Sequence, residues 1–181
     1  FSVPGGAFNR FTGTGTELDP YRVYDIYGLQ GIKGFLDLGT YFKLANDISL
    51  TAVQHWNYKG YGDTGDISNY YGFDPIGNQY GNFSGDFDGN RYVISDLYIN
   101  RPTMLYVGLF GRTSSATVHD VGLDGGSVLG GNNVGSLVGY NYQSVVRDSY
   151  ANTDVTGTSW VGGLVGYNDF HGSVTRSYAT G

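Results

Sequence analysis

Short apolar runs separated by turn-forming residues recur along this chain with a period of roughly 28 residues, which is typical of proteins built from stacked repeats. Each run holds three to five apolar residues bounded by Gly, Asn, Asp or Ser, which predicts strands and turns and not helices. A unit this short cannot bury its own apolar side, so successive units must stack around a shared core. Because crossovers between parallel strands are overwhelmingly right-handed, the pattern predicts an all-β chain folded as a right-handed parallel β-solenoid. Three runs mark the period: Leu109-Phe110-Gly111, Leu137-Val138-Gly139 and Leu164-Val165-Gly166.

Alternation of side chains within each unit predicts which residues point into the solenoid. Between Val146 and Ala151, we expect Val146, Ser149 and Ala151 inside and Asp148 near a corner. The glycines at the end of each marker run are expected at corners, where they allow turns that a Cβ would resist. The frame also predicts an outward row of Tyr98, Gly122, Tyr150 and Tyr178. A second predicted row, with neighbours about 4.8 Å apart, consists of Asp96, Asp120, Asp148 and Arg176.

The first part of the chain is less regular than the rest. Residues 42–50 alternate well enough to predict one strand, and residues 29–35 fit one short helix. Residues 57–82 form a long loop of Tyr, Gly, Asn and Asp with almost no periodicity. A solenoid must cover its first open coil, because exposed strand edges pair with other chains. We therefore expect residues 1–82 to be an irregular N-terminal cap, continuous with the solenoid coils of residues 83–181.

The repeated segments resemble a known family. Val161–Asn168 followed by Gly172–Ala179 is similar to a GLUG repeat, Val134–Ala151 to a second copy and Tyr106–Leu123 to a diverged third. The resemblance implies the β-helical architecture of large bacterial and archaeal surface and secreted proteins. These include haemagglutinin-like adhesins and the non-catalytic portions of immunoglobulin A-cleaving metallopeptidases. It implies no peptidase activity here, because that class needs a His-Glu-x-x-His helix, which is absent around each of His55, His119 and His171.

Composition narrows the possible partners and compartment. The chain has 16 acidic and 10 basic residues, which give a formal net charge of −6. Nucleic acids and anionic lipids both select a basic face, so we expect neither as a partner. No apolar run approaches the roughly 18 residues of a membrane helix, so we expect no membrane insertion. Cysteine is absent, which removes disulfides and thiolate chemistry, and no cofactor is expected. The acidic, lysine-poor chain begins at Phe1, and we expect an extracellular or cell-surface protein whose signal peptide has been removed.

Two sets of carboxylates are candidates for chemistry. Asp86, Asp88 and Asn90 alternate as in a calcium loop, although Leu97 stands where an EF-hand would need its glutamate, and a tight turn is the favoured interpretation. The predicted aspartate row must either splay into solvent or hold a cation, because stacked carboxylates repel one another. Glycan-cleaving enzymes need two such carboxylates, one of them with a raised pKa. A solvated corner is the simpler interpretation, and we assign no catalytic residue.

Tyrosine is the most informative excess, with 17 residues in the chain. Outward tyrosines present an apolar ring and a hydroxyl, which suits contacts with proteins or glycans. The alternative is that tyrosine simply fills strand positions, for which it has good propensity. The candidate binding residues are Tyr58, Tyr61, Tyr70, Tyr71 and Tyr80 in the long loop, and Tyr98, Tyr140, Tyr150, Tyr167 and Tyr178 on the coils.

These features together predict a non-enzymatic, extracellular, structural or adhesive module. Its expected partners are copies of itself, other surface proteins or glycans. No C-terminal cap is visible after the last copy, so we expect its open strand edges to stack end to end, either in a longer array or in filaments. A glycan-active β-helix enzyme and a passive surface spacer are the alternatives.

Overall fold

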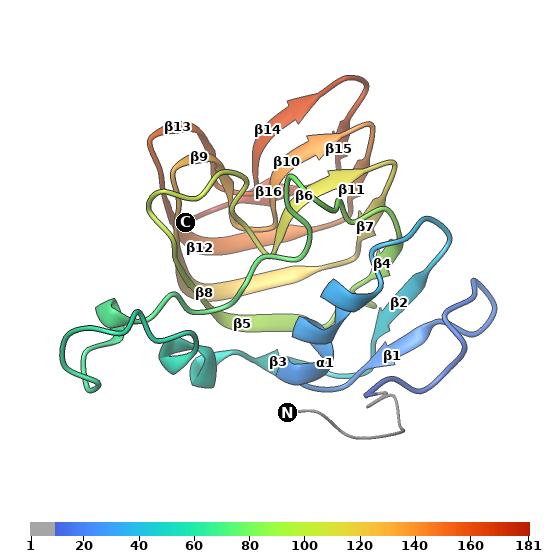
Figure 1. Cartoon of the computed structure of the whole chain (residues 1–181). Coiled ribbons are helices and arrows are strands. Elements are labelled where there is room, and N and C mark those ends of the chain that lie inside the picture. The colour runs from blue at the N-terminus through green and yellow to red at the C-terminus, as the bar shows by residue number, and fades with distance from the viewer. Residues whose placement is uncertain (1–9) are drawn as a thin grey trace.

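The computed structural model describes residues 10–181, and its regular structure is mainly short strands stacked one above another (Figure 1). One α-helix, α1 (Ile26–Gly31), and three 3-10 turns, η1 (Ile32–Gly34), η2 (Thr51–His55) and η3 (Ile67–Asn69), occur in this part of the chain. The first nine residues of the predicted cap, including Phe1, lie outside the described residues. The strands are β1 (Tyr21–Val23), β2 (Tyr41–Leu44), β3 (Ile48–Ser49), β4 (Asp86–Asp88), β5 (Val93–Asn100), β6 (Phe110–Ser114), β7 (Thr117–His119), β8 (Gly122–Leu129), β9 (Asn132–Gly135), β10 (Val138–Tyr142), β11 (Val145–Arg147), β12 (Tyr150–Thr156), β13 (Ser159–Gly162), β14 (Val165–Asp169), β15 (Ser173–Thr175) and β16 (Tyr178–Ala179).

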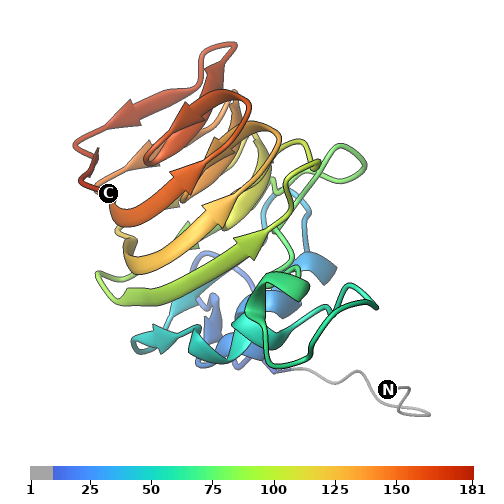
Figure 2. The same ribbon diagram turned by 90° about the vertical axis from the view of Figure 1, so that its left-hand side faces the viewer.

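Parallel pairing in register between these strands confirms the predicted β-solenoid. Its walls are the sheets β1-β2-β4-β7-β11-β15, β3-β5-β8-β12-β16, β6-β10-β14 and β9-β13. Residues one repeat step apart in the sequence pair with each other in the largest sheet. Val118 pairs with Val146, and Val146 pairs with Val174. Strands β6–β9, β10–β13 and β14–β16 make three successive coils, which Figure 2 shows stacked with the C-terminus on the last of them.

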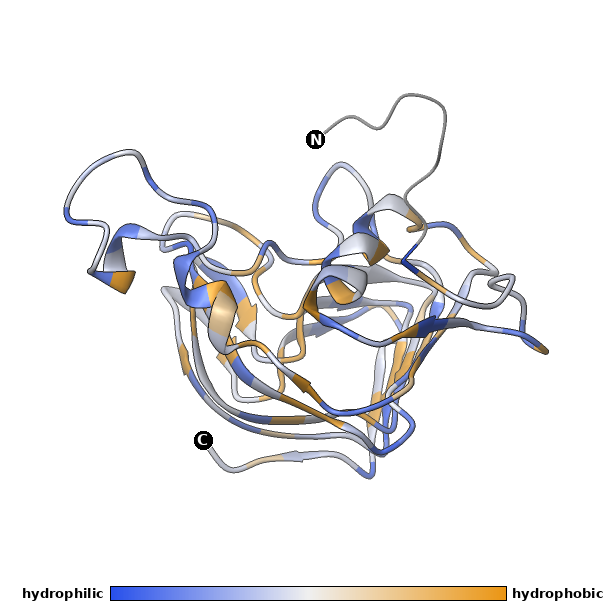
Figure 3. Cartoon of the chain, turned by 90° about the horizontal axis from the view of Figure 1, so that it is seen from below, coloured by the Kyte–Doolittle hydropathy of each residue, from blue (hydrophilic) through white to orange (hydrophobic). Residues whose placement is uncertain are grey.

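The N-terminal part of the chain extends the same sheets. The single strand expected over residues 42–50 is two strands, β2 and β3, because the chain turns a corner between them. Phe42 pairs with Phe87, and Ile48 pairs with Ile94, so both strands continue the walls of the next coil. The short helix expected at residues 29–35 is present as α1 and η1, over residues 26–34. Seen along the stack, segments from this part of the chain lie across the open lower end (Figure 3).

The long loop has two parts with different roles. Residues 57–71 are mostly exposed, as the polar composition predicts. Phe73 and Ile76, however, are fully buried, and Ile76 forms a parallel bridge with Phe110. Phe83 forms a similar bridge with Thr113, so residues 73–84 supply the wall beneath β6. The predicted loop thus has no named strand through residue 82, but its second half contributes buried residues and bridges to the solenoid.

The interior changes character along the stack. Aromatic rings fill the lower coils, where the ring centroids of Phe83 and Phe110 lie 4.8 Å apart and those of Phe87 and Phe110 lie 5.2 Å apart. The upper coils bury smaller side chains, among them Val146, Ser149 and Ala151, as the alternation predicts. Burial of apolar surface therefore contributes most of the stability of the lower coils, while the stability of the upper coils also depends on buried polar groups.

Several of those buried polar groups, Ser149 and Asn141 among them, are satisfied by ladders that run from coil to coil. The hydroxyl of Ser149 accepts a hydrogen bond from the backbone N–H of Val121 at 3.2 Å and donates to the Arg147 carbonyl at 2.8 Å. On the third wall, the side-chain amide of Asn141 donates to that of Asn168 at 2.7 Å and accepts from the Thr113 hydroxyl at 3.0 Å. Since a buried polar group is costly only when it lacks a partner, small polar residues fit this core.

The glycines of the marker runs do not form corners. Gly139 lies within β10, and a Cβ there would approach the backbone nitrogen of Val107 to 2.5 Å. Close packing of neighbouring backbone, and not a turn, is therefore what requires glycine. The corners instead hold Asp120, Asp148 and Arg176, with φ angles of 53°, 52° and 49°. Asp adopts this left-handed conformation more readily than most residues with a Cβ.

Two equivalent valines offer a test of how much the stacking stabilises a coil. Val146 has 0% of its surface exposed, whereas Val174 directly above it has 39%. We expect Val146→Ala to lower the free energy of unfolding by about 2 kcal/mol and Val174→Ala to lower it by less than half as much. Urea unfolding followed by circular dichroism measures both. Equal losses would contradict the burial of the middle coil.

Candidate functional site

A row of charged side chains runs up the outer face of the largest sheet. Side chains at paired positions of neighbouring strands point to the same face, and five charged residues occupy one such row, with the exposed Thr175 above them. Lys43 binds Asp88, with its Nζ 2.8 Å from the Asp88 Oδ2. A groove of about 560 Å³ lies beside this row and is also lined by Glu17, Leu18 and Tyr41. The five residues of this charged row are Arg22, Lys43, Asp88, His119 and Arg147.

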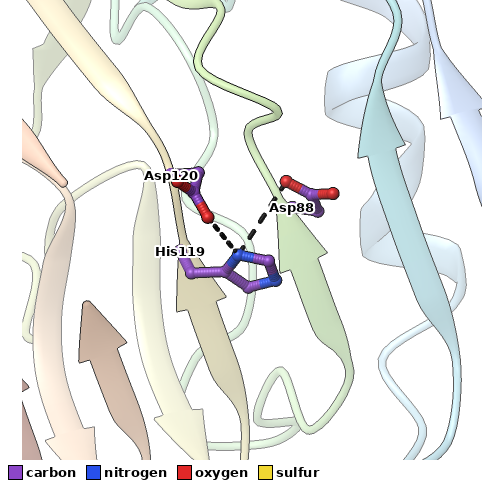
Figure 4. A group of neighbouring side chains, drawn as sticks. All are labelled: Asp88, His119 and Asp120. Atoms are coloured by element: carbon purple, nitrogen blue, oxygen red, sulfur yellow. Dashed lines mark hydrogen bonds and ion pairs between the residues drawn. The ribbon is translucent and has the colours of Figure 1, made fainter. Parts of the chain in front are cut away.

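Within the row, His119 lies close to three carboxylates. Its Nδ1 lies 2.8 Å from the Asp120 Oδ2 and 3.8 Å from the Asp88 Oδ1, and its Nε2 lies 3.3 Å from the Asp86 Oδ1. Asp86 and Asp88 project from β4, His119 ends β7, and Asp120 follows in the corner (Figure 4). The hydrogen bond to Asp86 raises the pKa of His119, partial burial opposes that shift, and the hydrogen bond to Asp120 adds to it.

The predicted aspartate row is a ladder of opposite charges in the upper coils. Arg176 binds Asp148 through Nε at 2.5 Å and Nη2 at 2.7 Å, and the Nη1 of Arg147 lies 3.0 Å from the same carboxylate. Hydrogen bonds from Arg176, followed by those from Arg147, hold the pKa of Asp148 well below its usual range. A glycosidase acid needs the opposite shift, so this geometry does not favour the enzyme alternative.

Asp96 does not belong to that row. It lies in β5 next to Ser95, which pairs with Asp124, and its carboxylate accepts a hydrogen bond from Thr51 at 3.0 Å. Below Asp120 the chain instead has Gly89, whose backbone N–H donates to the His119 carbonyl. The prediction failed because the lower coils do not keep the repeat step of the upper ones.

Two residues of the calcium hypothesis, Asp88 and Asn90, make the hydrogen bonds of a tight turn. Asp88 accepts a hydrogen bond from the Asn90 backbone N–H at 2.7 Å, as in a tight turn, and Asn90 has a φ of 52°. The Asn90 side-chain amide donates to the Leu44 carbonyl at 3.3 Å. This geometry favours the turn interpretation, and calcium at these residues stays a prediction. The acidic and histidine groups that do converge are Asp88, His119 and Asp120, with ligand atoms within 4.8 Å of one another.

The coil tyrosines form stacks along the solenoid axis. The rings of Tyr140 and Tyr167 lie 5.5 Å apart and nearly parallel, and those of Tyr150 and Tyr178 lie 5.6 Å apart. Desolvation, followed by the hydrogen bond to Asp169, raises the pKa of Tyr140 to about 12. In these stacks the ring faces cover one another, so contact with a ligand is restricted to ring edges and to the last ring of each stack.

Tyr98 points out of the solenoid, but it lies outside the predicted row and is covered by the long loop. It pairs with Ser127, while Val93 occupies the position below Gly122. Only 9% of Tyr98 is exposed, because the long loop covers it and its hydroxyl donates to the Ile67 carbonyl at 2.9 Å. The alternation correctly points its ring out of the solenoid, but the loop packs over it.

The loop tyrosines divide into structural and exposed residues. Tyr70 is buried and contacts the rings of His55 and Tyr58, so it holds the loop together. Tyr61 and Tyr80 are 65% and 90% exposed. Tyr58 and Tyr71 are also exposed, and Lys59 and Arg101 both lie over the Tyr71 ring. Binding through the exposed members stays a prediction.

Three aromatic residues, Tyr142, Trp160 and Phe170, were missed by the sequence analysis. Trp160 in β13 contacts Tyr167 with a centroid distance of 5.5 Å, and Phe170, which follows β14, stacks on Tyr142 at the same distance. Trp160 and Phe170 are both largely exposed. A search for aromatic residues at the repeat step would have found Tyr142 and Phe170, which stand one such step apart in the sequence.

Comparison with known protein families finds two tandem matches to the model described as the GLUG motif, at residues 130–156 and 157–181. The diverged third copy, at residues 106–123, precedes the matched ranges, although β6 pairs with β10 in the same register as β10 with β14. The resemblance seen in the repeated segments is thus confirmed for its two regular copies.

Two relatives match most of this chain. Halomucin from Haloquadratum walsbyi is 35% identical over 176 residues, which cover 93% of this chain. A protein named as a Gly-rich membrane protein, from Evansella cellulosilytica, is 32% identical over 194 aligned positions that cover 86% of it. The chain spans only 2% and 21% of the lengths of these relatives.

A solved structure named as an immunoglobulin A1 protease from Bacteroides ovatus aligns with 97% of this chain and 74% of its own length. Its sequence identity is 16% and its TM-score 0.47. Within residues 10–181, no helix has both the length and the apolar character that crossing a bilayer requires.

The Asp148 ion pairs predict an acid-dependent contribution to stability. A carboxyl whose pKa is lowered on folding stabilises the fold above its unfolded pKa, and that stabilisation disappears as the pH falls through the folded pKa. Asp148→Asn should therefore lower the melting temperature at pH 7, and the difference from wild type should shrink below pH 3.8, the ordinary value for this group. Exposed Asp154→Asn serves as the control for loss of one charge. A difference that is unchanged at low pH would contradict the ion-pair assignment.

Proposed function

We propose that this chain, a GLUG-repeat protein by its two tandem motifs, serves as a non-enzymatic structural and adhesive module of an extracellular surface protein. Its solenoid would act as a rigid scaffold that lengthens by coil-on-coil stacking. Relatives named halomucin and Gly-rich membrane protein support a place at the cell surface.

The observation that carries the proposal is that an inward side chain becomes buried only where another coil lies above it. Val174 and Ala179 point inward like Val146 and Ala151 beneath them, yet both are exposed, whereas the two beneath are fully buried. Exposed inward apolar side chains beside the unpaired edges of β14, β15 and β16 favour pairing with another strand layer. A coil of the same period meets this need, because it offers parallel strands in the same register.

Aromatic side chains reinforce that surface. Three ring stacks run from one coil to the next, and among the described residues no later coil continues them. They are Tyr140–Tyr167, Tyr142–Phe170 and Tyr150–Tyr178. A stacked aromatic pair contributes about 0.5–1.5 kcal/mol beyond its buried area. A further coil that places aromatic residues at the same step would extend each stack.

Self-association of the chain tests the stacking. We expect the average mass to rise with concentration in analytical ultracentrifugation, and Val174→Lys to abolish the rise because it places a charge in the contact. Thr175→Lys, at the next position but on the outer face, is the matched control and should still associate. A wild-type chain that stays strictly monomeric at millimolar concentration would refute self-association, leaving a spacer role.

The exposed part of the long loop is the proposed adhesive surface. Its ends meet, because the Tyr71 and Gly72 N–H groups bond the carbonyls of Asn57 and Trp56. Ile67 and Thr64 bond the buried Tyr98 and Tyr70, so the backbone of the loop is kept and its two most exposed tyrosines are replaced together, as Tyr61→Ala with Tyr80→Ala. We expect this replacement to reduce binding to a glycan array or to host-cell surface protein at least tenfold while the circular dichroism spectrum is retained. Unchanged binding would count against the loop.

A further inference from the structure

We propose that Asp88, His119 and Asp120 form a binding site for a divalent transition-metal ion of the zinc class. The three side chains come from adjacent coils, and Figure 4 shows the two carboxylates approaching the same nitrogen of the imidazole ring.

Both ring nitrogens of His119 face carboxylates, Nδ1 towards Asp120 and Asp88 and Nε2 towards Asp86. Two carboxylates therefore converge on one nitrogen, and a third lies at the opposite nitrogen of the same ring. A metal ion bound at Nδ1 would take the place of a proton there, while the Nε2–H donates to Asp86.

The spacing between the His119 Nδ1 and the two carboxylate oxygens suits a zinc ion. Zinc bonds of 2.0–2.2 Å in tetrahedral geometry place neighbouring ligand atoms roughly 3.4 Å apart. The Nδ1 of His119 lies 2.8 Å from one carboxylate oxygen and 3.8 Å from the other, which brackets that value. Asp86 is then the carboxylate that fixes the ring tautomer from behind, as is usual for metal-binding histidines.

Three cationic side chains lie near the carboxylates of the site and occupy other positions around them. Lys43 contacts the Oδ2 of Asp88, while the Oδ1, which accepts from the Asn90 N–H, faces His119. Arg147 lies 3.8 Å from Asp120 but only 3.0 Å from Asp148, so Asp148 is its closer partner. Arg91 lies 3.8 Å from the Asp120 Oδ1, and it is the Oδ2 of Asp120 that faces His119.

The ligand types favour zinc over calcium. Calcium takes six to eight oxygen ligands, whereas two carboxylates and one imidazole match the N and O donors that zinc prefers. His119 has 13% of its side chain exposed, and the groove beside the charged row gives solvent access. A fourth position is therefore open to water.

Isothermal titration of the whole chain with zinc chloride, after dialysis against a chelator, tests this site. We expect one equivalent to bind, with affinity reduced at least tenfold by His119→Ala and by Asp120→Asn. His171→Ala removes an exposed histidine outside the cluster and should leave the affinity unchanged. Absence of zinc binding, an equal loss in His171→Ala, or calcium binding as tight as zinc binding would overturn the proposal.

A second measurement does not depend on variants that might lose the fold. Cobalt(II) titrated into the wild-type chain should give visible d–d absorption bands with the intensity of a four-coordinate site, and equimolar zinc should remove them. Weak bands of hexaaquo-like intensity would overturn the proposal. Asp86→Asn, which alters only the residue behind the ring, should weaken zinc binding about tenfold or more.

Discussion

Every feature of this molecule depends on parallel hydrogen bonding between coils that keep the same register. No coil can bury its inward side chains alone, and each gains its core only from the layers above and below. The stacking also explains why polar residues such as Ser149 and Asn141 tolerate full burial, since each finds its partner one coil away. The same dependence explains why Val174 and Ala179, with no described coil above them, are exposed while Val146 and Ala151 beneath them are buried.

Register also creates the charged row and the cluster around His119. Lys43, Asp88, His119 and Arg147 are far apart and unevenly spaced in the sequence, yet they lie side by side on one sheet. A strand position that faces solvent needs no apolar residue, so the outer face is free to carry charge without weakening the core. The scaffold and its candidate metal site are therefore chemically independent, although they share the same strands.

The tyrosine excess has more than one cause. Tyr98 and Tyr70 attach the long loop to the solenoid, and Tyr140 and Tyr150 join neighbouring coils by stacking. These residues stabilise the fold. The exposed tyrosines of the loop, such as Tyr61, make a smaller set for which contact with a partner stays a prediction.

The sequence by itself determined the solenoid, the register of its upper coils and the inward positions of Val146, Ser149 and Ala151, because a regular repeat translates directly into stacked strands. It could not determine the lower coils, where insertions break the period, so Asp96 and Tyr98 were assigned to the wrong rows. Only the tertiary structure brought Asp86 and Asp88 to His119, because the length of each insertion hides which strands become neighbours. It also revealed that Gly139 is required by close backbone packing, a contact between coils that no local pattern records.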